Sequence, residues 1–221
     1  MADRQDRATL EDRWVTFSRA CDTVLVVAVS AAYLEDVLLV DRCLGGEEAA
    51  ARELFRRHRA RVHGSLFRVL GSNRDMDDLM QEAFLQVFQS LRAWRAEASL
   101  ATWIDRIAVR VVFHHLRGRK STVPLDVIGE IDAGGGRVDD QTQAREGLRR
   151  LYGVLAELSA DSRMAFSLFA IDGRSIAEVA ELTQTSLVAA KCRIWRARRE
   201  VMKRAKNDVM LAELVKEEAE S

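Results

Sequence analysis

Apolar residues recur every three or four positions along most of the chain, most regularly between Arg74 and Lys120. In the first half of that stretch the apolar positions are Leu79, Met80, Ala83, Phe84, Val87, Phe88 and Leu91. In the second half they are Leu100, Trp103, Ile104, Ile107, Val111, Val112 and Leu116. This spacing predicts two consecutive amphipathic helices.

The polar faces of these two helices differ in charge. The first helix carries Asp78, Gln81, Glu82 and Gln86. The second carries Arg106, Arg110, His114, Arg117, Arg119 and Lys120. An acidic face suits a basic protein partner, and a basic face suits a polyanion, so the pattern predicts one surface of each kind.

The same spacing predicts further helices upstream. A helix begins near Glu35, breaks at Gly45–Gly46, and is followed by a long helix to about Leu70 that Gly71 caps. The next helix starts near Ser72 or Asn73, and Ser99 is a suitable N-cap for the helix that follows. Short joints between amphipathic helices predict a compact helical domain over residues 35–120.

Residues 121–145 change in character, because they hold Pro124 and the run Gly134–Gly136, and they predict a flexible linker. A second helical domain is expected over residues 146–206, followed by a tail at 207–221. It contains a short helix, Ile176–Leu182, a turn, Thr183–Thr185, and a second helix that Ser186 caps. This is helix-turn-helix spacing.

The second helix of this motif has a buried face and a basic outer face. The residues expected to be buried are Leu187, Ala190, Ile194, Ala197 and Val201. The outer face carries Val188, Lys191, Cys192, Trp195, Arg196 and Arg199. Arg and Lys reach guanine acceptors or phosphates, and small residues let the helix N-terminus approach the bases, so this face predicts docking in the DNA major groove.

Composition restricts the kinds of function that remain. The 221 residues contain 34 Lys+Arg and 34 Asp+Glu, and this zero net charge argues against indiscriminate nucleic-acid binding. The charge is instead local, with eight Lys or Arg against one acid between Lys191 and Lys206. The three cysteines, Cys21, Cys43 and Cys192, lie far apart, which indicates a reducing compartment without a disulfide framework.

Several chemistries are not expected. His114 and His115 are neighbours, so on a helix they point about 100° apart and do not clamp one metal ion. No Gly-rich phosphate loop or nucleophile–base set is recognisable, which predicts a protein without enzymatic activity, cofactor or small-molecule substrate.

Residues 1–34 have no assigned role. Their apolar run, Val24–Leu34, is shorter than the roughly 20 residues of a membrane span, so we expect a buried helix or a mis-set start codon, with a targeting role as the alternative.

Four strings in this order carry a resemblance to a known family: DDLMQEAFLQVF, WRAEASLATWIDRIA followed by LRGRK, DGRSIAEVAELTQTS, and KCRIWRAR. Together they resemble the extracytoplasmic-function (ECF) group of bacterial RNA polymerase sigma factors, over roughly residues 35–206. The resemblance implies an all-α, two-domain transcription initiation factor. The domain at 35–120 corresponds to sigma region 2, and the domain at 146–206 to sigma region 4.

The resemblance also implies partners and sites. Asp78, Gln81 and Glu82 correspond to the face that grips the β′ clamp helices of core RNA polymerase, and the β flap is a second contact. Reading and melting of the −10 element falls to Trp94, Arg95, Arg110, His114, Arg117, Arg119 and Lys120. Reading of the −35 element falls to Ser186, Val188, Lys191, Cys192, Arg193, Trp195, Arg196 and Arg199. An anti-sigma factor is an implied partner, and the implied location is cytoplasmic, with nucleoid association in the holoenzyme and membrane proximity only through the anti-sigma factor.

Two positions depart from the family pattern. Arg110 stands where the family often has Asn, which predicts an unusual −10 preference, because arginine favours guanine or phosphate. Gln184 stands where the family favours Gly in the turn, and a non-glycine residue with positive φ costs about 1 kcal/mol. Two alternatives stay open: a helix-turn-helix regulator that binds DNA unaided, and a sigma-like interaction module that has lost promoter opening.

Overall fold

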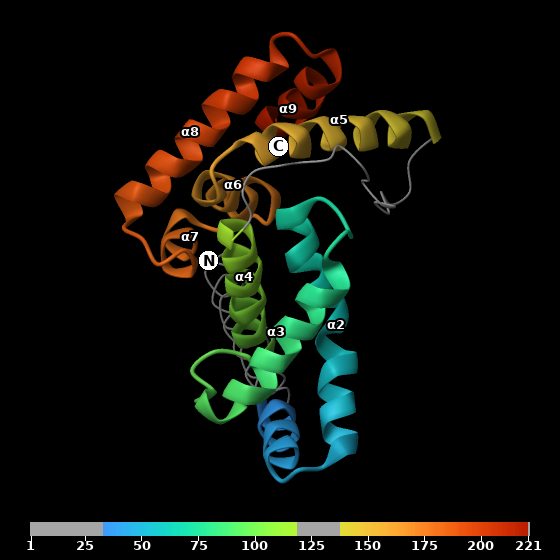
Figure 1. Ribbon diagram of the computed structural model, residues 1–221, viewed down its shortest axis with the longest axis vertical. Helices are drawn as coiled ribbons and strands as arrows, with labels where there is room; N and C mark the ends of the chain where they lie inside the picture. Colours follow the sequence, from blue (N-terminus) through green and yellow to red (C-terminus); the bar gives the residue numbers. More distant parts are fainter. Residues whose placement is uncertain (1–32, 119–137, 221) are drawn as a thin grey trace, which may run out of the picture. The chain divides into compact units, whose positions relative to one another are not determined.

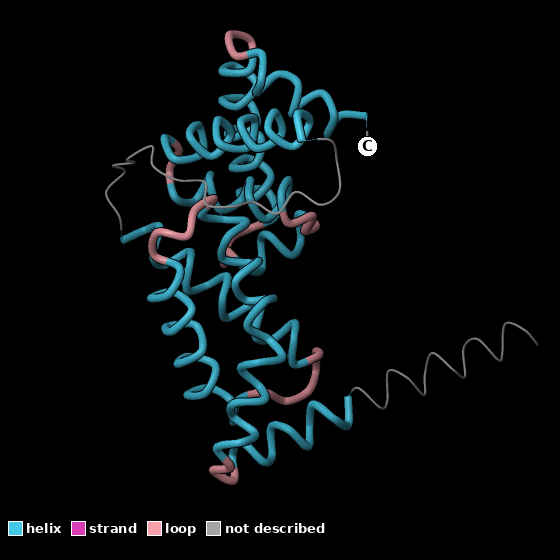
Figure 2. Tube along the Cα trace, turned by 90° about the vertical axis from the view of Figure 1, so that its right-hand side faces the viewer, coloured by secondary structure: helices cyan, strands magenta, loops and turns pink. Residues whose placement is uncertain are grey.

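The computed structural model describes residues 33–118 and 138–220, and all regular secondary structure in these ranges is helical (Figures 1 and 2). The expected all-α fold class is therefore confirmed. A helix at residues 33–44 is followed by α2 (Glu48–Leu70), α3 (Met76–Ser90), η1 (Leu91–Ala93), α4 (Leu100–Gly118), α5 (Val138–Glu157), α6 (Ala160–Phe166), the π-helix η2 (Ser167–Ile171), α7 (Ile176–Leu182), α8 (Leu187–Ala205) and α9 (Val209–Glu220). Outside the described residues lie most of the N-terminal extension with Cys21, the linker up to residue 137, Arg119 and Lys120.

The chain divides into two compact units, one of which contains residues 33–54 and 91–100. In this unit the helix at residues 33–44 ends in the expected glycine break, where Gly46 has φ +83° and the Gly45 N–H donates to the Asp41 carbonyl at 2.9 Å. The Asp36 carboxylate accepts a hydrogen bond from the Leu100 N–H at 3.2 Å. It therefore satisfies one of the free backbone donors at the start of α4.

The second unit contains residues 55–90 and 101–220, and its first helices confirm most of the apolar periodicity, although Phe88 is 37% exposed. The buried apolar residues of α3 are Met76, Leu79, Ala83, Phe84 and Val87. Those of α4 within this unit are Ile104, Ile107, Ala108, Val109, Val111, Val112, Phe113 and Leu116. The expected start of α3 was too early: the helix begins at Met76, whose N–H donates to the Asn73 carbonyl at 3.2 Å, so residues 72–75 form a turn.

The C-terminal helices share a core of their own. Its buried members come from α5, α6, α8 and α9, and they are Leu151, Tyr152, Val154, Leu155, Phe166, Ala197, Val201, Ala205 and Leu211. Two boundaries differ from expectation: α5 begins at Val138 rather than near Glu146, and residues 207–221, expected as a tail, contain α9. Helix α9 packs along α5 and α8 (Figure 1). The helical C-terminal region therefore extends beyond the expected residues 146–206 at both ends.

The C-terminal end of α2 is capped by residues from far along the chain. The helix stops at Leu70, and Gly71 takes φ +65°. The Tyr152 hydroxyl donates to the Arg68 carbonyl at 2.9 Å, and the Arg163 guanidinium donates to the Leu70 carbonyl at 2.8 Å. These contacts satisfy carbonyls that an α-helix leaves free at its end. Burial raises the pKa of Tyr152 to about 12.

Candidate nucleic-acid interface

Helices α7 and α8 form the helix-turn-helix, with the bounds that the sequence predicts for α7. Ser175 makes a capping box with Glu178 at the start of α7, and Ser186 caps α8 by accepting from the Ala189 N–H at 3.1 Å. The turn between them is tied to α7 by the buried Thr183, whose hydroxyl donates to the Val179 carbonyl at 2.7 Å. Each helix is thus fixed at the end where the two meet.

The outer face of α8 is exposed and basic. The residues on it are the expected Val188, Lys191, Cys192, Trp195, Arg196 and Arg199, all of which are exposed. Arg199 lies over the Trp195 ring, with its guanidinium carbon 5.1 Å from the ring centroid. Ala190, Ile194, Ala197 and Val201 are buried as expected, but Leu187 is 57% exposed. The expectation for Leu187 was wrong, because it occupies the first position of α8, where no preceding turn of the same helix covers it.

Arg193, expected on the −35 face, is half-buried and turned toward α6. Its guanidinium lies 2.7 Å from one carboxylate oxygen of Asp161, and the other oxygen of Asp161 is 2.9 Å from Arg117. Arg117, expected on the −10 face, also lies over the Phe113 ring, 4.4 Å from its centroid. One carboxylate therefore holds an arginine from each proposed DNA-binding set.

The other −10 candidates fall into two groups, one in each compact unit. In the first unit Arg95 is exposed, and Trp94 is half-buried, with its indole N–H donating to the Ala98 carbonyl at 3.1 Å. In the second unit Arg110 and His114 are both exposed on α4. Arg110 and His114 are four residues apart on one helix, so they share a face.

Asp78, Gln81 and Glu82 are all exposed on α3, as expected for a surface that binds a protein partner. Asp78 lies in the first turn, where a carboxylate interacts favourably with the helix dipole. Glu82 accepts a hydrogen bond from the Gln86 amide at 2.6 Å. The three side chains follow one another at helix spacing and form a single polar stripe.

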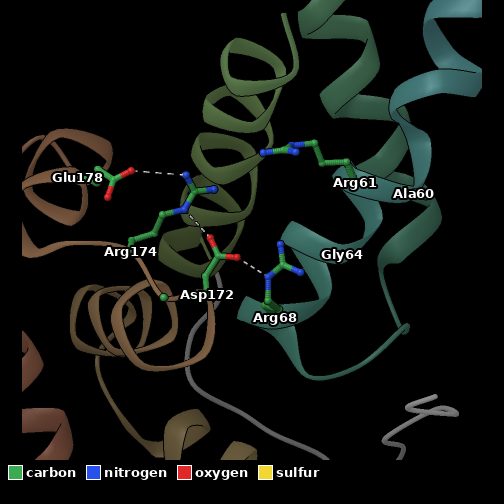
Figure 3. Close-up of a pocket in the computed structure, with 8 residues that line it drawn as sticks. Ala60, Arg61, Gly64, Arg68, Asp172, Arg174 and Glu178 are labelled. Carbon is green, nitrogen blue, oxygen red and sulfur yellow. Dashed lines mark hydrogen bonds and ion pairs between the residues drawn. The ribbon is translucent and has the colours of Figure 1, made fainter. Parts of the chain in front are cut away.

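A buried ion-pair cluster lies in the second unit and was missed from the sequence. Asp105 of α4 is 2% exposed, and its carboxylate accepts from the Ser65 hydroxyl and from Arg174. Arg174 also pairs with Asp172 at 2.7 Å, and Asp172 with Arg68 (Figure 3). Burial opposes ionisation of Arg174, but the carboxylates of Asp172 and Asp105 outweigh it and raise the pKa of Arg174. The available signal in the sequence was the carboxylate of Asp105 next to Ile104, within a helix whose polar face is otherwise basic.

A polar cavity of about 490 Å³ adjoins this cluster. Its lining consists of Ala60, Arg61, Gly64, Arg68, Asp172, Gly173, Arg174 and Glu178 (Figure 3).

In the residues that the structure describes, no group of three or more His, Cys, Asp or Glu is placed to hold a metal ion. Within the same residues, no helix has the length and apolar character needed to cross a membrane.

The backbone conformation of Gln184, in the turn between α7 and α8, leads to a testable prediction. This residue takes φ +52°, which is unfavourable for a residue with a Cβ. We expect Gln184→Gly to raise the free energy of unfolding by about 0.5–1 kcal/mol, because relief of this strain exceeds the extra chain entropy of glycine. Urea unfolding followed by circular dichroism measures the change. Gln184→Ala is the matched control: it removes the same side chain but keeps the Cβ, and an equal gain from it would contradict the argument.

The helix-turn-helix, with its capped second helix and basic exposed face, defines a sequence-reading DNA-binding protein of the helix-turn-helix class.

Two family models match the chain: Sigma-70 region 2 over residues 54–122 and Sigma-70, region 4 over residues 148–201. The ECF RNA polymerase sigma-E factor of Haemophilus influenzae is 30% identical, over 76% of this chain and 94% of that protein. That of Escherichia coli is 29% identical, over 75% and 91%.

Two solved structures are also similar. CnrH, in complex with the cytosolic domain of CnrY, aligns with a TM-score of 0.52 and 25% identity over 78% of this chain and 98% of CnrH. RpoE of Bartonella quintana, in complex with the anti-sigma factor NepR, aligns with a TM-score of 0.52 and 19% identity over 71% and 97%, which supports the fold alone. The chain belongs to the ECF group of the sigma-70 family. It is a transcription initiation factor, as the sequence motifs predicted.

Proposed function

We propose that this chain binds core RNA polymerase through the polar stripe Asp78, Gln81 and Glu82 of α3. The stripe is exposed, and two of its three members are carboxylates. Charge-assisted hydrogen bonds to basic side chains are among the stronger polar contacts that proteins make. The β′ clamp helices are the partner that the family suggests for this stripe, with the β flap as a separate contact.

The −10 element is read and opened by residues from Trp94 to Lys120 in this proposal. Trp94 offers an aromatic surface for an unpaired base, and such stacking contributes about 1–3 kcal/mol per base. Arg110 and His114 are exposed on α4, where they meet phosphate or base edges. Duplex opening needs no bond chemistry, because captured bases and neutralised phosphates offset the lost base stacking.

The −35 element is read by α8, and the exposed basic face of this capped helix is the observation that carries the proposal. Lys191, Arg196 and Arg199 supply the positive charge, and Ser186 lies at the end of the helix that faces the bases. Arg193 contributes once Asp161 releases it, since phosphate and carboxylate compete for the same guanidinium. Cytoplasmic location and an anti-sigma partner that covers these faces complete the proposal, and family membership supports both.

Run-off transcription tests the proposal on a template taken from upstream of the protein's own gene. We expect specific transcripts with core polymerase plus the wild-type chain. Asp78→Ala/Glu82→Ala should lower both transcript yield and polymerase affinity at least tenfold, because each lost charged hydrogen bond is worth about 1.5–3 kcal/mol. Affinity is measured separately by fluorescence anisotropy of the labelled chain.

A matched control removes two carboxylates elsewhere. Asp41 and Glu213 are exposed acids outside the proposed site, so Asp41→Ala/Glu213→Ala should transcribe like the wild type. Polymerase binding without transcripts from any promoter would favour the interaction module instead. Tight duplex binding by the chain alone, with no affinity for polymerase, would favour the unaided regulator.

A further inference from the structure

The first turn of α8 presents two adjacent aliphatic side chains to solvent. Leu187 is 57% exposed and Val188 is 73% exposed. Single exposed apolar residues are common on protein surfaces. These two, however, begin the helix that is proposed to enter the major groove, and in such helices the N-terminal residues contact the base edges.

The position of both side chains is set by the local structure. Ser186 caps α8 through the Ala189 N–H at 3.1 Å, and its carbonyl accepts from the Ala190 N–H at 2.9 Å. Ala190 is fully buried and ties the first turn to the rest of the motif. Val188 is β-branched and has one strongly preferred rotamer in a helix. The two aliphatic groups therefore protrude from a rigid turn, and little ordering is needed when they meet a ligand.

The surroundings of the pair favour DNA over a protein as the group that covers it. Lys191, Cys192 and Trp195 are exposed along the same side of α8, followed by Arg196 and Arg199. The first acid in α8 is Glu200, at the far end of this face. A basic surface of this kind attracts a polyanion.

Thymine is the one base that offers an apolar group in the major groove. Guanine, adenine and cytosine show only polar donors and acceptors there, whereas thymine adds its C5-methyl group. We propose that Leu187 and Val188 select thymine in the −35 element by burying this methyl group. The inference rests on the proposed reading of the −35 element by α8 and names the base chemistry that this reading uses.

The experiment removes the methyl group and the side chains separately. Holoenzyme assembled from core polymerase and the full chain first selects sequences from a promoter library randomised in the −35 region. Each thymine in the enriched sequence, on either strand, is then replaced with deoxyuridine, which lacks only the methyl group. Burial of one methyl group corresponds to about a fourfold change in affinity. We expect a loss of this size with the wild type and none with Leu187→Ala/Val188→Ala.

Met202→Ala is the matched control, because Met202 is an exposed apolar residue (44%) at the other end of the same helix. This variant should keep the full deoxyuridine effect. An enriched element of G·C pairs alone would overturn the inference. So would an undiminished deoxyuridine effect in the double alanine variant, because the methyl group would then be contacted by other residues. Failure to enrich any upstream sequence is a distinct result, in which the proposed −35 reading fails together with the inference.

Discussion

Asp105→Ala is expected to lower the free energy of unfolding by about 3 kcal/mol, at the lower end of the range for removing one partner of a buried ion pair. Asp105 is 2% exposed, and its carboxylate accepts from Ser65 and Arg174. The substitution leaves both donors without that acceptor. Arg174 retains Asp172 at 2.7 Å, and this remaining pair limits the loss. Urea denaturation followed by far-ultraviolet circular dichroism gives the change from the midpoint and slope.

The neighbouring residue provides the control. Arg106 makes an exposed pair with Glu181 at 3.3 Å, and exposed pairs contribute about 0–1 kcal/mol. Arg106→Ala changes the next position of the same helix, and we expect it to leave the free energy of unfolding nearly unchanged. Equal stability of the Asp105→Ala, Arg106→Ala and wild-type chains would show that the carboxylate is not held between Ser65 and Arg174 in solution.

Gly71→Ala is expected to destabilise the chain by several kcal/mol for two separate reasons. Gly71 has φ +65°, which costs a residue with a Cβ about 1–2 kcal/mol. A Cβ at this position would also lie 2.2 Å from Cγ of Tyr152. The Tyr152 ring is buried and its hydroxyl is bonded to the Arg68 carbonyl, so it yields little, and overpacking of this kind costs about a further 1–3 kcal/mol. The same urea denaturation measures the loss.

Gly173→Ala separates the two contributions. Gly173 has φ +68° but has no atom within 4 Å of its added Cβ, so this variant carries the backbone cost alone. In a double-mutant cycle, Gly71→Ala should cost less stability in the Tyr152→Ala background than in the wild type, because the clash with the ring is then absent. Equal effects of Gly71→Ala and Gly173→Ala, with no coupling between positions 71 and 152, would contradict the close approach of Tyr152 to the end of α2.

Much of the local structure of this chain was readable from its sequence through short-range rules. The 3.6-residue periodicity identified α3 and α4, and Gly71 was recognised as the end of α2 from its position after the last apolar residue. The bounds of α7 followed from helix-turn-helix spacing, and the capping role of Ser186 from capping chemistry. Each of these features depends on residues within about one helical turn of one another.

The start of α3 and the extent of the C-terminal unit were less predictable. Ser72 and Asn73 are good capping residues, yet the chain makes a turn through residues 72–75 before α3 begins at Met76. Helix α9 was expected as a tail, and it is stabilised by packing: Leu211 is buried in the core that α5 and α8 share. Propensity alone does not decide such elements, because most helical stability comes from tertiary packing.

The sequence by itself determined most of the helices, the polar stripe of α3, the helix-turn-helix and the family. Only the tertiary structure decided the partners of buried charges: Asp105 with Arg174, and Asp161 with both Arg117 and Arg193. It also decided that Leu187 is exposed. The physical reason is that periodicity specifies which face of a helix is apolar, while the groups that meet a given side chain lie tens of residues away and are brought together only by packing.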